Sequence, residues 1–392
     1  MNANIFATFE AIGRKAGDAP FLETDDGQIV SYAQMLGMTA RYANALARLG
    51  VQPGDRVAVQ VDKSARNYCL YLATLRMGAT YLPLNTAYQL GELAYFLEDA
   101  EPRVFVCAPA DLAVKSELAL RHGVAHAMTL TDEGSGTLDA LAASEADTHD
   151  TAQVPGDEVA IIVYTSGTTG RPKGAMLTHA SLLSNAQALT KLWGFTGKDV
   201  LLHALPLFHA HGLFISSHCA LLSGSRMMFL KKFSAEQVLS LLPRATVMMG
   251  VPTFYTRLLD QPGFTAASTA NMRLFVSGSA PLLAETNKEF QQRTGQIVLE
   301  RYGMTESAII TSNPFVGERR IGSVGKAIDG VEVRVADGDD QPLPADQIGG
   351  IQIRGSGVMK GYWRKPEKTA EEFTADGWFR TGDQGTLSRD GY

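Results

Sequence analysis

Two spacings of hydrophobic positions alternate along the first part of the chain. Between Ser31 and Gly50, apolar residues recur at helical intervals, and both ends carry residues that start or stop a helix, which predicts an amphipathic helix. The short apolar run at 56–60 predicts a buried strand, and residues 64–77 predict a second helix. Repeated alternation of strand and helix favours a parallel sheet with crossover helices.

Further short apolar runs continue this pattern, and its character changes beyond Asn313. There, alternating runs at 331–335 and 350–354 lie between Gly, Asp and Pro turns, which predicts antiparallel strands and a small β-barrel. We therefore expect an α/β protein with mostly parallel sheets in two α/β subdomains, followed by an antiparallel β subdomain. Buried strands are predicted at 159–163, 200–202, 247–250 and 274–278, and the three parts are expected at 1–160, 161–312 and 313–392.

Composition narrows the class of protein. The 392 residues are 45% hydrophobic and 19% charged, as in ordinary globular proteins. A net charge of −6 argues against nucleic acid as the main partner. There is no run of about twenty apolar residues to span a membrane, and the N-terminus lacks the basic and apolar regions of a signal peptide. Three widely spaced cysteines, Cys69, Cys107 and Cys219, suit a reducing compartment rather than a metal site, so we expect a cytoplasmic location.

The segment Tyr164–Gly174 is the most informative stretch of the chain. It leaves the predicted strand at 159–163 and contains three glycines, four Ser or Thr hydroxyls and Lys173. Backbone N–H groups, hydroxyls and one cation together suit a polyphosphate ligand. The glycine spacing differs from that of a P-loop. A flexible linker is the alternative, but linkers rarely combine a strand exit, fixed glycine spacing and a Pro-Lys-Gly end.

This loop and two later segments, Glu300–Glu306 and Gly377–Asp383, resemble three signatures of the adenylate-forming enzymes. That family comprises acyl-CoA synthetases, luciferases and the adenylation domains of peptide synthetases. The resemblance covers essentially all 392 residues. It implies the large N-terminal domain of such an enzyme, which activates a carboxylic acid with ATP and Mg²⁺ and uses CoA as a co-substrate. All the implied partners are small molecules, with no nucleic acid and no membrane.

The resemblance implies a role for each signature. The adenine would lie against Tyr302, and Asp383 would accept hydrogen bonds from both ribose hydroxyls. Glu306 would hold Mg²⁺, a hard cation that favours carboxylate and phosphate oxygens. The alternatives are a solvated surface carboxylate for Glu306 and a turn or capping role for Asp383. The residues implied to contact the nucleotide are Thr165, Ser166, Gly167, Thr168, Thr169, Gly170, Lys173, Ser279, Ala280, Pro281, Tyr302, Gly303, Met304, Thr305 and Asp383, and those implied in catalysis are Thr165, Lys173, His209 and Glu306.

A third set of residues is implied to hold the acid. His209 matches a family position that orients the carboxylate toward the α-phosphate of ATP, whereas His211 is interpreted as a packing or hydrogen-bonded histidine. Ser277 begins a turn of small residues that, in the family, borders both the adenine and the acyl pocket. The residues expected to contact the acid are therefore His209, Ser277 and Arg301.

Arg301 suggests which acid is activated. The resemblance places it beside the acyl pocket, where many relatives have a neutral residue. A guanidinium facing an acyl tail would be a buried unpaired charge, whereas a second carboxylate would form a bidentate pair with it. We therefore expect a dicarboxylic acid, and the branch of the family that makes malonyl-CoA is the most similar. The alternative for Arg301 is an ion pair with Glu300 or another protein carboxylate. Methylmalonate is the nearest competitor of malonate as the substrate, because one extra methyl group changes the binding free energy by only about 1–3 kcal/mol.

Other readings of the family resemblance stay open. The chain could be another acyl-CoA ligase, which would use acetate, a fatty acid or an aryl acid. It could also be the adenylation domain of a peptide synthetase, although no carrier domain follows it in this sequence. A third alternative is a nucleotide-binding module that has no catalytic activity of its own. The chain ends at Tyr392, where relatives continue into a hinge and a C-terminal domain that carries a lysine of the active site. From that resemblance we expect a truncated chain that binds ATP and malonate but turns them over poorly, because the C-terminal domain completes the site.

Overall fold

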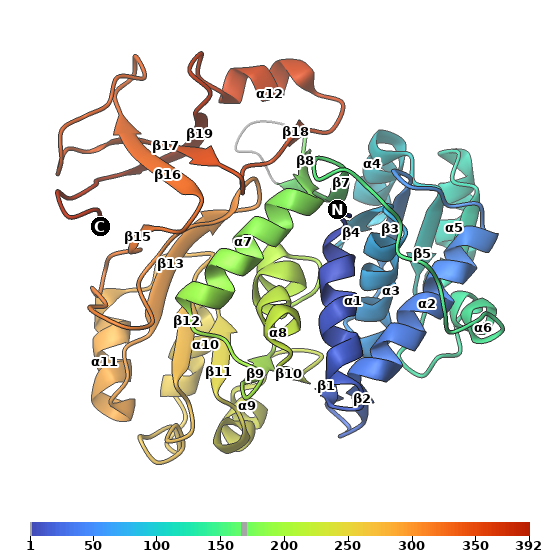
Figure 1. The fold of residues 1–392 in the computed structure, drawn as a ribbon, viewed down its shortest axis with the longest axis horizontal. Helices are drawn as coiled ribbons and strands as arrows, with labels where there is room; N and C mark the ends of the chain where they lie inside the picture. The colour runs from blue at the N-terminus through green and yellow to red at the C-terminus, as the bar shows by residue number, and fades with distance from the viewer. Residues whose placement is uncertain (1, 166–170) are drawn as a thin grey trace.

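The computed structural model describes residues 2–165 and 171–392, and over these residues the strands form three sheets (Figure 1). The first sheet has the order β18-β8-β7-β4-β3-β5-β6, and its central strands are parallel. Its strands are β3 (Arg56–Gln60), β4 (Thr80–Pro83), β5 (Val104–Cys107), β6 (His126–Thr129), β7 (Val159–Thr165), β8 (Lys173–Thr178) and β18 (Gly361–Tyr362).

The second sheet has the order β15-β14-β13-β12-β11-β9-β10-β1-β2 and is parallel from β13 to β1. Its strands are β1 (Pro20–Thr24), β2 (Ile29–Ser31), β9 (Val200–His203), β10 (Arg226–Phe229), β11 (Val247–Gly250), β12 (Leu274–Ser277), β13 (Leu299–Met304), β14 (Ala308–Ser312) and β15 (Lys326–Ala327). The third sheet is antiparallel, with the order β16 (Val331–Ala336), β17 (Gly349–Gly355) and β19 (Phe379–Gly385).

Helices cover the sheets and fill the space between the first two. The helices are α1 (Ile5–Ala16), α2 (Tyr32–Arg48), α3 (Ala65–Arg76), α4 (Leu90–Ala100), α5 (Leu112–Arg121), α6 (Thr137–Ala143), α7 (His179–Leu192), α8 (Ser217–Ser223), α9 (Ala235–Leu241), α10 (Pro252–Leu259), α11 (Ala284–Thr294) and α12 (Pro366–Glu372), with a π-helical segment, η2 (His211–Ser216), before α8. In Figure 1, α7 and α8 lie between the blue N-terminal half and the yellow and orange half. None of the helices in the described parts of the chain has the length and apolar composition that a membrane crossing needs.

The sequence patterns predicted these elements well. The expected helix after Ser31 is α2, and the Ser31 hydroxyl accepts from Gln34 N–H at 3.1 Å while the Gln34 side chain accepts from Ser31 N–H at 2.8 Å, a reciprocal cap. The mostly parallel α/β organisation is confirmed, and the third sheet is antiparallel as the alternating runs indicated. The sequence did not predict β8, which pairs antiparallel with β7 and places Lys173 opposite Thr165.

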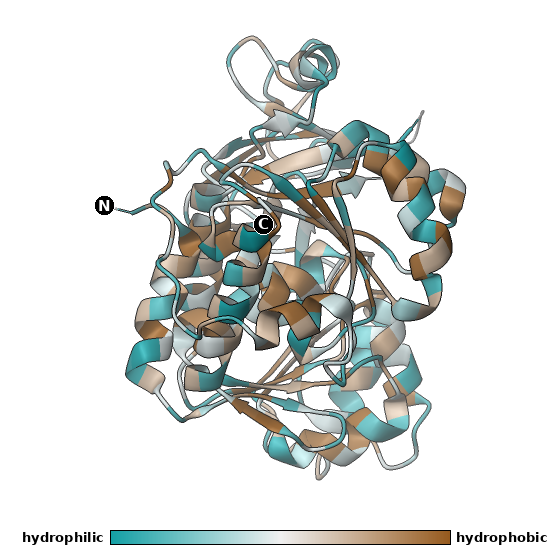
Figure 2. Cartoon of the chain, turned by 90° about the vertical axis from the view of Figure 1, so that its right-hand side faces the viewer, coloured by the Kyte–Doolittle hydropathy of each residue, from teal (hydrophilic) through white to brown (hydrophobic). Residues whose placement is uncertain are grey.

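One hydrophobic core joins the first two sheets. It takes side chains from β3, β4 and β7 on one side, from β9 to β13 on the other, and from α1, α2, α3, α7 and α8 between them. Hydrophobic residues, brown in Figure 2, run along the strands and the helix faces that pack on them. Strands β1 and β2, although they come early in the chain, belong to the second sheet. The domain boundaries at 160 and 312 stay a prediction.

Candidate active site

The predicted site residues follow the carboxyl ends of strands. Thr165 ends β7 and Ser277 ends β12, while His209 follows β9 by six residues. The carboxyl ends of parallel strands lie on one edge of a sheet and form the usual ligand-binding crevice of open α/β folds. Five of the residues predicted to hold phosphate lie outside the described residues: Ser166, Gly167, Thr168, Thr169 and Gly170.

Thr165, Lys173 and Glu306 come together at one end of the site. The Thr165 hydroxyl donates to Glu306 Oε1 at 3.4 Å, and the Tyr362 hydroxyl donates to the same oxygen at 3.0 Å. Lys173 Nζ lies 4.2 Å from the centre of the Tyr362 ring and 3.0 Å from Glu372 Oε1. The sequence analysis missed Tyr362 and Glu372. Neither residue belongs to the three signatures that carry the family resemblance.

Glu306 is a buried carboxylate, only 6% exposed. Burial raises its pKa, while the hydrogen bonds from Tyr362 and Thr165 and the charge of Lys173 partly offset that rise. In the part of the chain that the structure describes, no basic side chain forms an ion pair with it, and no cluster of three or more candidate metal ligands exists. A lone buried carboxylate fits Mg²⁺, which binds through one or two carboxylates with phosphate and water oxygens.

The second and third signatures meet through Tyr302 and Asp383. The Tyr302 hydroxyl donates to Asp383 Oδ2 at 2.6 Å, and burial together with this carboxylate raises the pKa of Tyr302. Tyr302 lies on β13, which turns back into β14 as a tight hairpin. A Cβ at Gly303 would lie 2.1 Å from the Ala308 carbonyl oxygen, so this close approach requires glycine. Met304 and Thr305 lie half-buried at the hairpin.

Arg301 is buried, at 4% exposed, against the turn that follows β12. A Cβ at Gly278 would lie 2.2 Å from its Cζ, so the guanidinium lies directly on the glycine backbone. Within residues 2–165 and 171–392, Arg301 Nε and Nη2, Ser277 Oγ and His211 Nε2 have no hydrogen-bond partner. Burial lowers the pKa of Arg301 to about 10, so it stays charged at neutral pH.

The expected alternative, an ion pair between Arg301 and a protein carboxylate, does not occur among the described residues. Glu300 Oε1 accepts instead from Gly322 N–H at 2.9 Å and from Asn287 Nδ2 at 3.1 Å. Adjacent residues of a strand point to opposite faces of the sheet, so Glu300 and Arg301 are separated by β13 itself. The guanidinium therefore faces the site with N–H groups that can still donate hydrogen bonds to a ligand.

His211, rather than His209, contacts this cluster. His211 is 4% exposed and its Nδ1 lies 3.3 Å from Ser279 Oγ. Burial, and next the charge of Arg301, hold the pKa of His211 well below its usual range, so the imidazole is neutral. Ser279 has φ of 70°, in the left-handed region where a non-glycine residue is strained, as binding-site residues often are. Ala280 and Pro281 follow it at the surface.

The ring of His209 is exposed, and no hydrogen bond to it is present among the described residues. Its backbone carbonyl accepts from Gly212 and Leu213 N–H groups at 3.1 and 2.9 Å. The sequence analysis interpreted His211 as a packing histidine and so missed its place beside Arg301. The two histidines are only two residues apart, and the sequence could not tell which of them turns inward.

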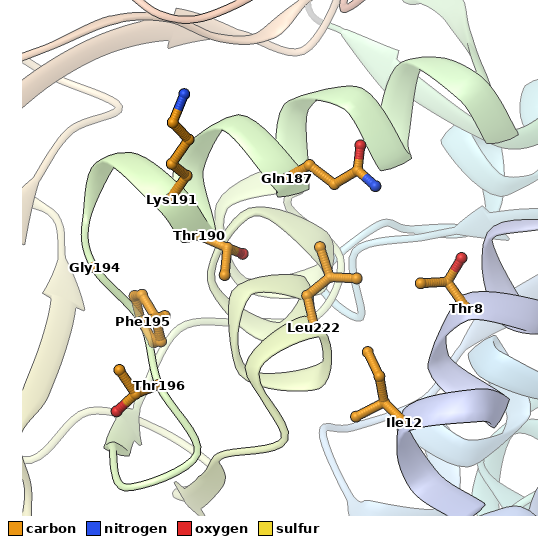
Figure 3. A pocket seen from close by; sticks show the side chains of 9 residues that line it. All are labelled: Thr8, Ile12, Gln187, Thr190, Lys191, Gly194, Phe195, Thr196 and Leu222. Atoms are coloured by element: carbon orange, nitrogen blue, oxygen red, sulfur yellow. The ribbon is translucent and has the colours of Figure 1, made fainter. Parts of the chain in front are cut away.

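A groove of about 480 Å³ between α1, α7 and α8 lies apart from these residues (Figure 3). Its one charged lining residue, Lys191, pairs with Asp329 at 2.6 Å. None of the predicted site residues lines it, and we assign it no role. The residues that line it are Thr8, Ile12, Gln187, Thr190, Lys191, Gly194, Phe195, Thr196 and Leu222.

Comparison with known proteins identifies the family. The model of the AMP-binding enzyme family matches residues 9–363. The chain is 34% identical over 383 residues to a protein named Probable CoA ligase CCL8 of Humulus lupulus, covering 91% of this chain and 63% of the relative. It is 35% identical over 395 residues to the mitochondrial malonate–CoA ligase ACSF3 of Mus musculus, covering 90% of this chain and 67% of the relative.

The solved structures agree with this result. The crystal structure of apo MatB from Rhodopseudomonas palustris is 49% identical and superimposes with a TM-score of 0.97, over 100% of this chain and 78% of that one. The chain therefore belongs to the family of AMP-binding enzymes, and it has the fold expected for the large domain of adenylate-forming enzymes.

The unpaired charge of Arg301 leads to a stability prediction. The substitution Arg301→Met should raise the free energy of unfolding without ligands, by about 1–3 kcal/mol, because it removes a desolvated charge that lacks a counter-ion. Arg273→Met is the matched control. Arg273 holds Asp199 through two contacts of 2.6 and 2.9 Å, so its loss should lower stability by about 3 kcal/mol. Urea denaturation measures both, and an equal loss in the two variants would contradict the unpaired state of Arg301.

Proposed function

We propose that the protein activates malonate with ATP and transfers it to CoA, as an AMP-forming malonate–CoA ligase. One observation carries the proposal: the buried guanidinium of Arg301 lies on Gly278 and lacks a counter-ion among the described residues. Ser277 Oγ, on the residue before Gly278, and His211 Nε2 are likewise unpartnered there. A second carboxylate on the acid would pair with Arg301 and accept from Ser277. The family match and the name of the mouse relative support the same activity.

In the first half-reaction, one malonate carboxylate oxygen attacks the α-phosphorus of ATP. A bond from carboxylate oxygen to phosphorus forms, the bond to the bridging oxygen breaks, and pyrophosphate leaves with the electron pair. Thr165 and Lys173, with the loop at 166–170, would hold the β- and γ-phosphates, and His209 would orient the attacking carboxylate. Because no covalent bond to the protein is formed, the residues act by positioning and by neutralising charge.

The nucleoside would lie between the turn at 279–281 and the β13–β14 hairpin. Asp383 now accepts from Tyr302 at 2.6 Å, and its carboxylate has acceptor capacity for both ribose hydroxyls. Gly303, Met304 and Thr305 would border the adenine and the α-phosphate. Lys173 now pairs with Glu372 at 3.0 Å, so the triphosphate would replace a carboxylate with a stronger anion.

Mg²⁺ is proposed at Glu306. The carboxylate is buried and has no ion-pair partner among the described residues, and Thr165 and Tyr362 hold it by hydrogen bonds. A bound Mg²⁺ would supply positive charge that neutralises the phosphate oxygens. Glu306 would therefore fix the position of the metal relative to the loop that begins at Thr165.

CoA is the proposed second substrate, and a cavity of about 360 Å³ offers it an approach. Side chains from β3 and β4 line this cavity together with residues that follow β9 and β10 of the second sheet, among them Phe208, and Lys231 and Lys232 are exposed at its wall. Two lysines suit the phosphates of CoA, while the apolar wall suits the pantetheine arm. The CoA thiolate would attack the malonyl carbonyl carbon, and AMP would leave as the carbon–oxygen bond breaks.

We also propose a cytoplasmic location. Cys69, Cys107 and Cys219 are all free and buried, and burial raises the pKa of each thiol. Free, protonated thiols suit a reducing compartment.

The acid preference can be tested by calorimetric titration of malonate and of propionate with Mg²⁺ and a non-hydrolysable ATP analogue present. Malonate should bind at least about 100-fold more tightly than propionate, because propionate leaves Arg301 buried and unpaired. Arg301→Met should abolish this difference. Equal binding of the two acids to the wild-type protein would refute the malonate assignment and leave a ligase for another acid.

The role of Glu306 predicts a pH dependence. Because its pKa is raised above the ordinary 4.5, the carboxyl is protonated, and Mg²⁺ is lost, as pH falls through that raised value. The gain in affinity for the ATP analogue on adding Mg²⁺ should thus shrink as the pH is lowered from neutral toward the ordinary carboxyl pKa of 4.5.

Glu306→Gln serves as the control, since the analogue's own protonation affects both proteins equally. The variant should show a much smaller Mg²⁺ effect at every pH. Parallel Mg²⁺ effects in the two proteins over this range would exclude Glu306 as the metal ligand.

A further inference from the structure

Lys63 is buried, at 7% exposed, and forms no ion pair with a carboxylate among the described residues. It follows β3 of the first sheet, but all three of its hydrogen bonds go to the end of β9 in the second sheet. Its Nζ donates to the His203 carbonyl at 2.8 Å and to the Leu205 carbonyl at 2.9 Å, and it lies 2.6 Å from His203 Nδ1. Three acceptors satisfy the three N–H groups of an ammonium. Burial holds the pKa of Lys63 well below its usual range.

His203 links Lys63 to the segment 204–211, which follows β9. A carbonyl oxygen can only accept a hydrogen bond, so His203 Nε2 carries the proton and donates to the Gly212 carbonyl at 2.8 Å. Burial holds the pKa of His203 well below its usual range, so the imidazole is neutral and its Nδ1 accepts from Lys63 Nζ. The two side chains thus hold the segment 204–211 at both ends, Lys63 at Leu205 and His203 at Gly212.

The ends of the segment 204–211 also touch one another. A Cβ at Gly212 would lie 2.1 Å from the Pro206 carbonyl oxygen, so only glycine permits this approach. The segment carries both histidines of the candidate site: His209 within it, and His211, which reaches Ser279 at 3.3 Å. Small shifts at the ends of this segment would therefore move His211 relative to Arg301.

A purely structural role would not favour these residues. Burying a lysine costs free energy that a well-packed apolar residue avoids, and here Nζ lies over an aromatic ring, 4.2 Å from the centre of Phe229. What a lysine adds is three directed hydrogen bonds to one strand end. Because Lys63 follows a strand of the first sheet, its hydrogen bonds fix the position of the acid pocket, which belongs to the second sheet, relative to the first sheet.

We propose that Lys63 and His203 are positioning residues for the acid: together they fix the segment 204–211 so that His209 and His211 face the malonate carboxylates. This inference rests on the proposed malonate activity. It assigns neither residue a contact with malonate or ATP, and it predicts an effect on binding of the acid that is absent for the nucleotide. Lys63 also lines the cavity proposed for CoA, so binding is measured without CoA.

The test uses Lys63→Met, which keeps the length of the side chain and removes its N–H groups. With Mg²⁺ and a non-hydrolysable ATP analogue present, the Kd for malonate should rise at least about tenfold, the scale expected for losing a buried charged hydrogen bond. The Kd for the analogue itself should change less than about twofold. Arg76→Met is the matched control, since Arg76 is also buried but lies in α3 and bonds to Leu36, Thr39 and Glu10. It should leave both constants unchanged even if it lowers the melting temperature.

A second variant, His203→Phe, keeps the ring and leaves Lys63 its two carbonyls, but it removes the bond to Gly212. It should weaken malonate binding to a similar extent. If Lys63→Met does not fold, this variant alone tests the positioning role. In ¹⁵N-histidine-labelled wild-type protein, NMR should show His203 as a single Nε2–H tautomer, and Lys63→Met should shift its Nδ1 resonance.

The outcomes separate the two proposals. Malonate binding that is tight in the wild type and unchanged in both variants would overturn the positioning role and leave the proposed function standing. A wild-type protein that binds the ATP analogue but not malonate would overturn the proposed function, and the positioning role with it. Equal losses for acid and nucleotide would show a general structural defect and so contradict the inference.

Discussion

The burial of a positive charge without a counter-ion is the constraint around which the acid pocket is built. Taking a guanidinium out of water costs several kcal/mol, and Arg301 regains none of this through an ion pair with the described residues. Only a large core can carry such a cost, and here both sheets and the helices between them share one. Gly278 lets the guanidinium lie against the backbone, so packing surrounds a charge that is still able to bind an anion.

The other buried arginine among the described residues forms an ion pair, so the unpaired state of Arg301 distinguishes the candidate site. Away from the site, Arg273 pairs with Asp199 and the buried Arg76 pairs with Glu10. Within the candidate site, Arg301 and Glu306 are buried with no ion pair among the described residues. Desolvated groups whose pKa values are shifted cluster at functional sites more often than elsewhere. The acid and the metal-bound phosphates are the groups that would complement these two charges.

Contacts between distant parts of the sequence assemble the site. Thr165 meets Glu306 across 141 residues, Lys63 meets His203 across 140, and Tyr302 meets Asp383 across 81. Each of these contacts joins two different sheets, or the segments that directly follow their strands. The relative placement of the three sheets therefore determines whether nucleotide, metal and acid can be held at once.

The sequence by itself determined the local structure and the signatures. Helical and alternating periods are properties of neighbouring residues, so α2, β3 and the antiparallel third sheet could be predicted, and so could the segments at 300–306 and 377–383. The tertiary structure alone decided that β8 pairs with β7, that Glu300 turns away from Arg301, that His211 rather than His209 lies beside it, and that Lys63 reaches His203. These contacts depend on which side chains lie nearby in space and on whether packing excludes water from them. No local pattern of residue types encodes either property.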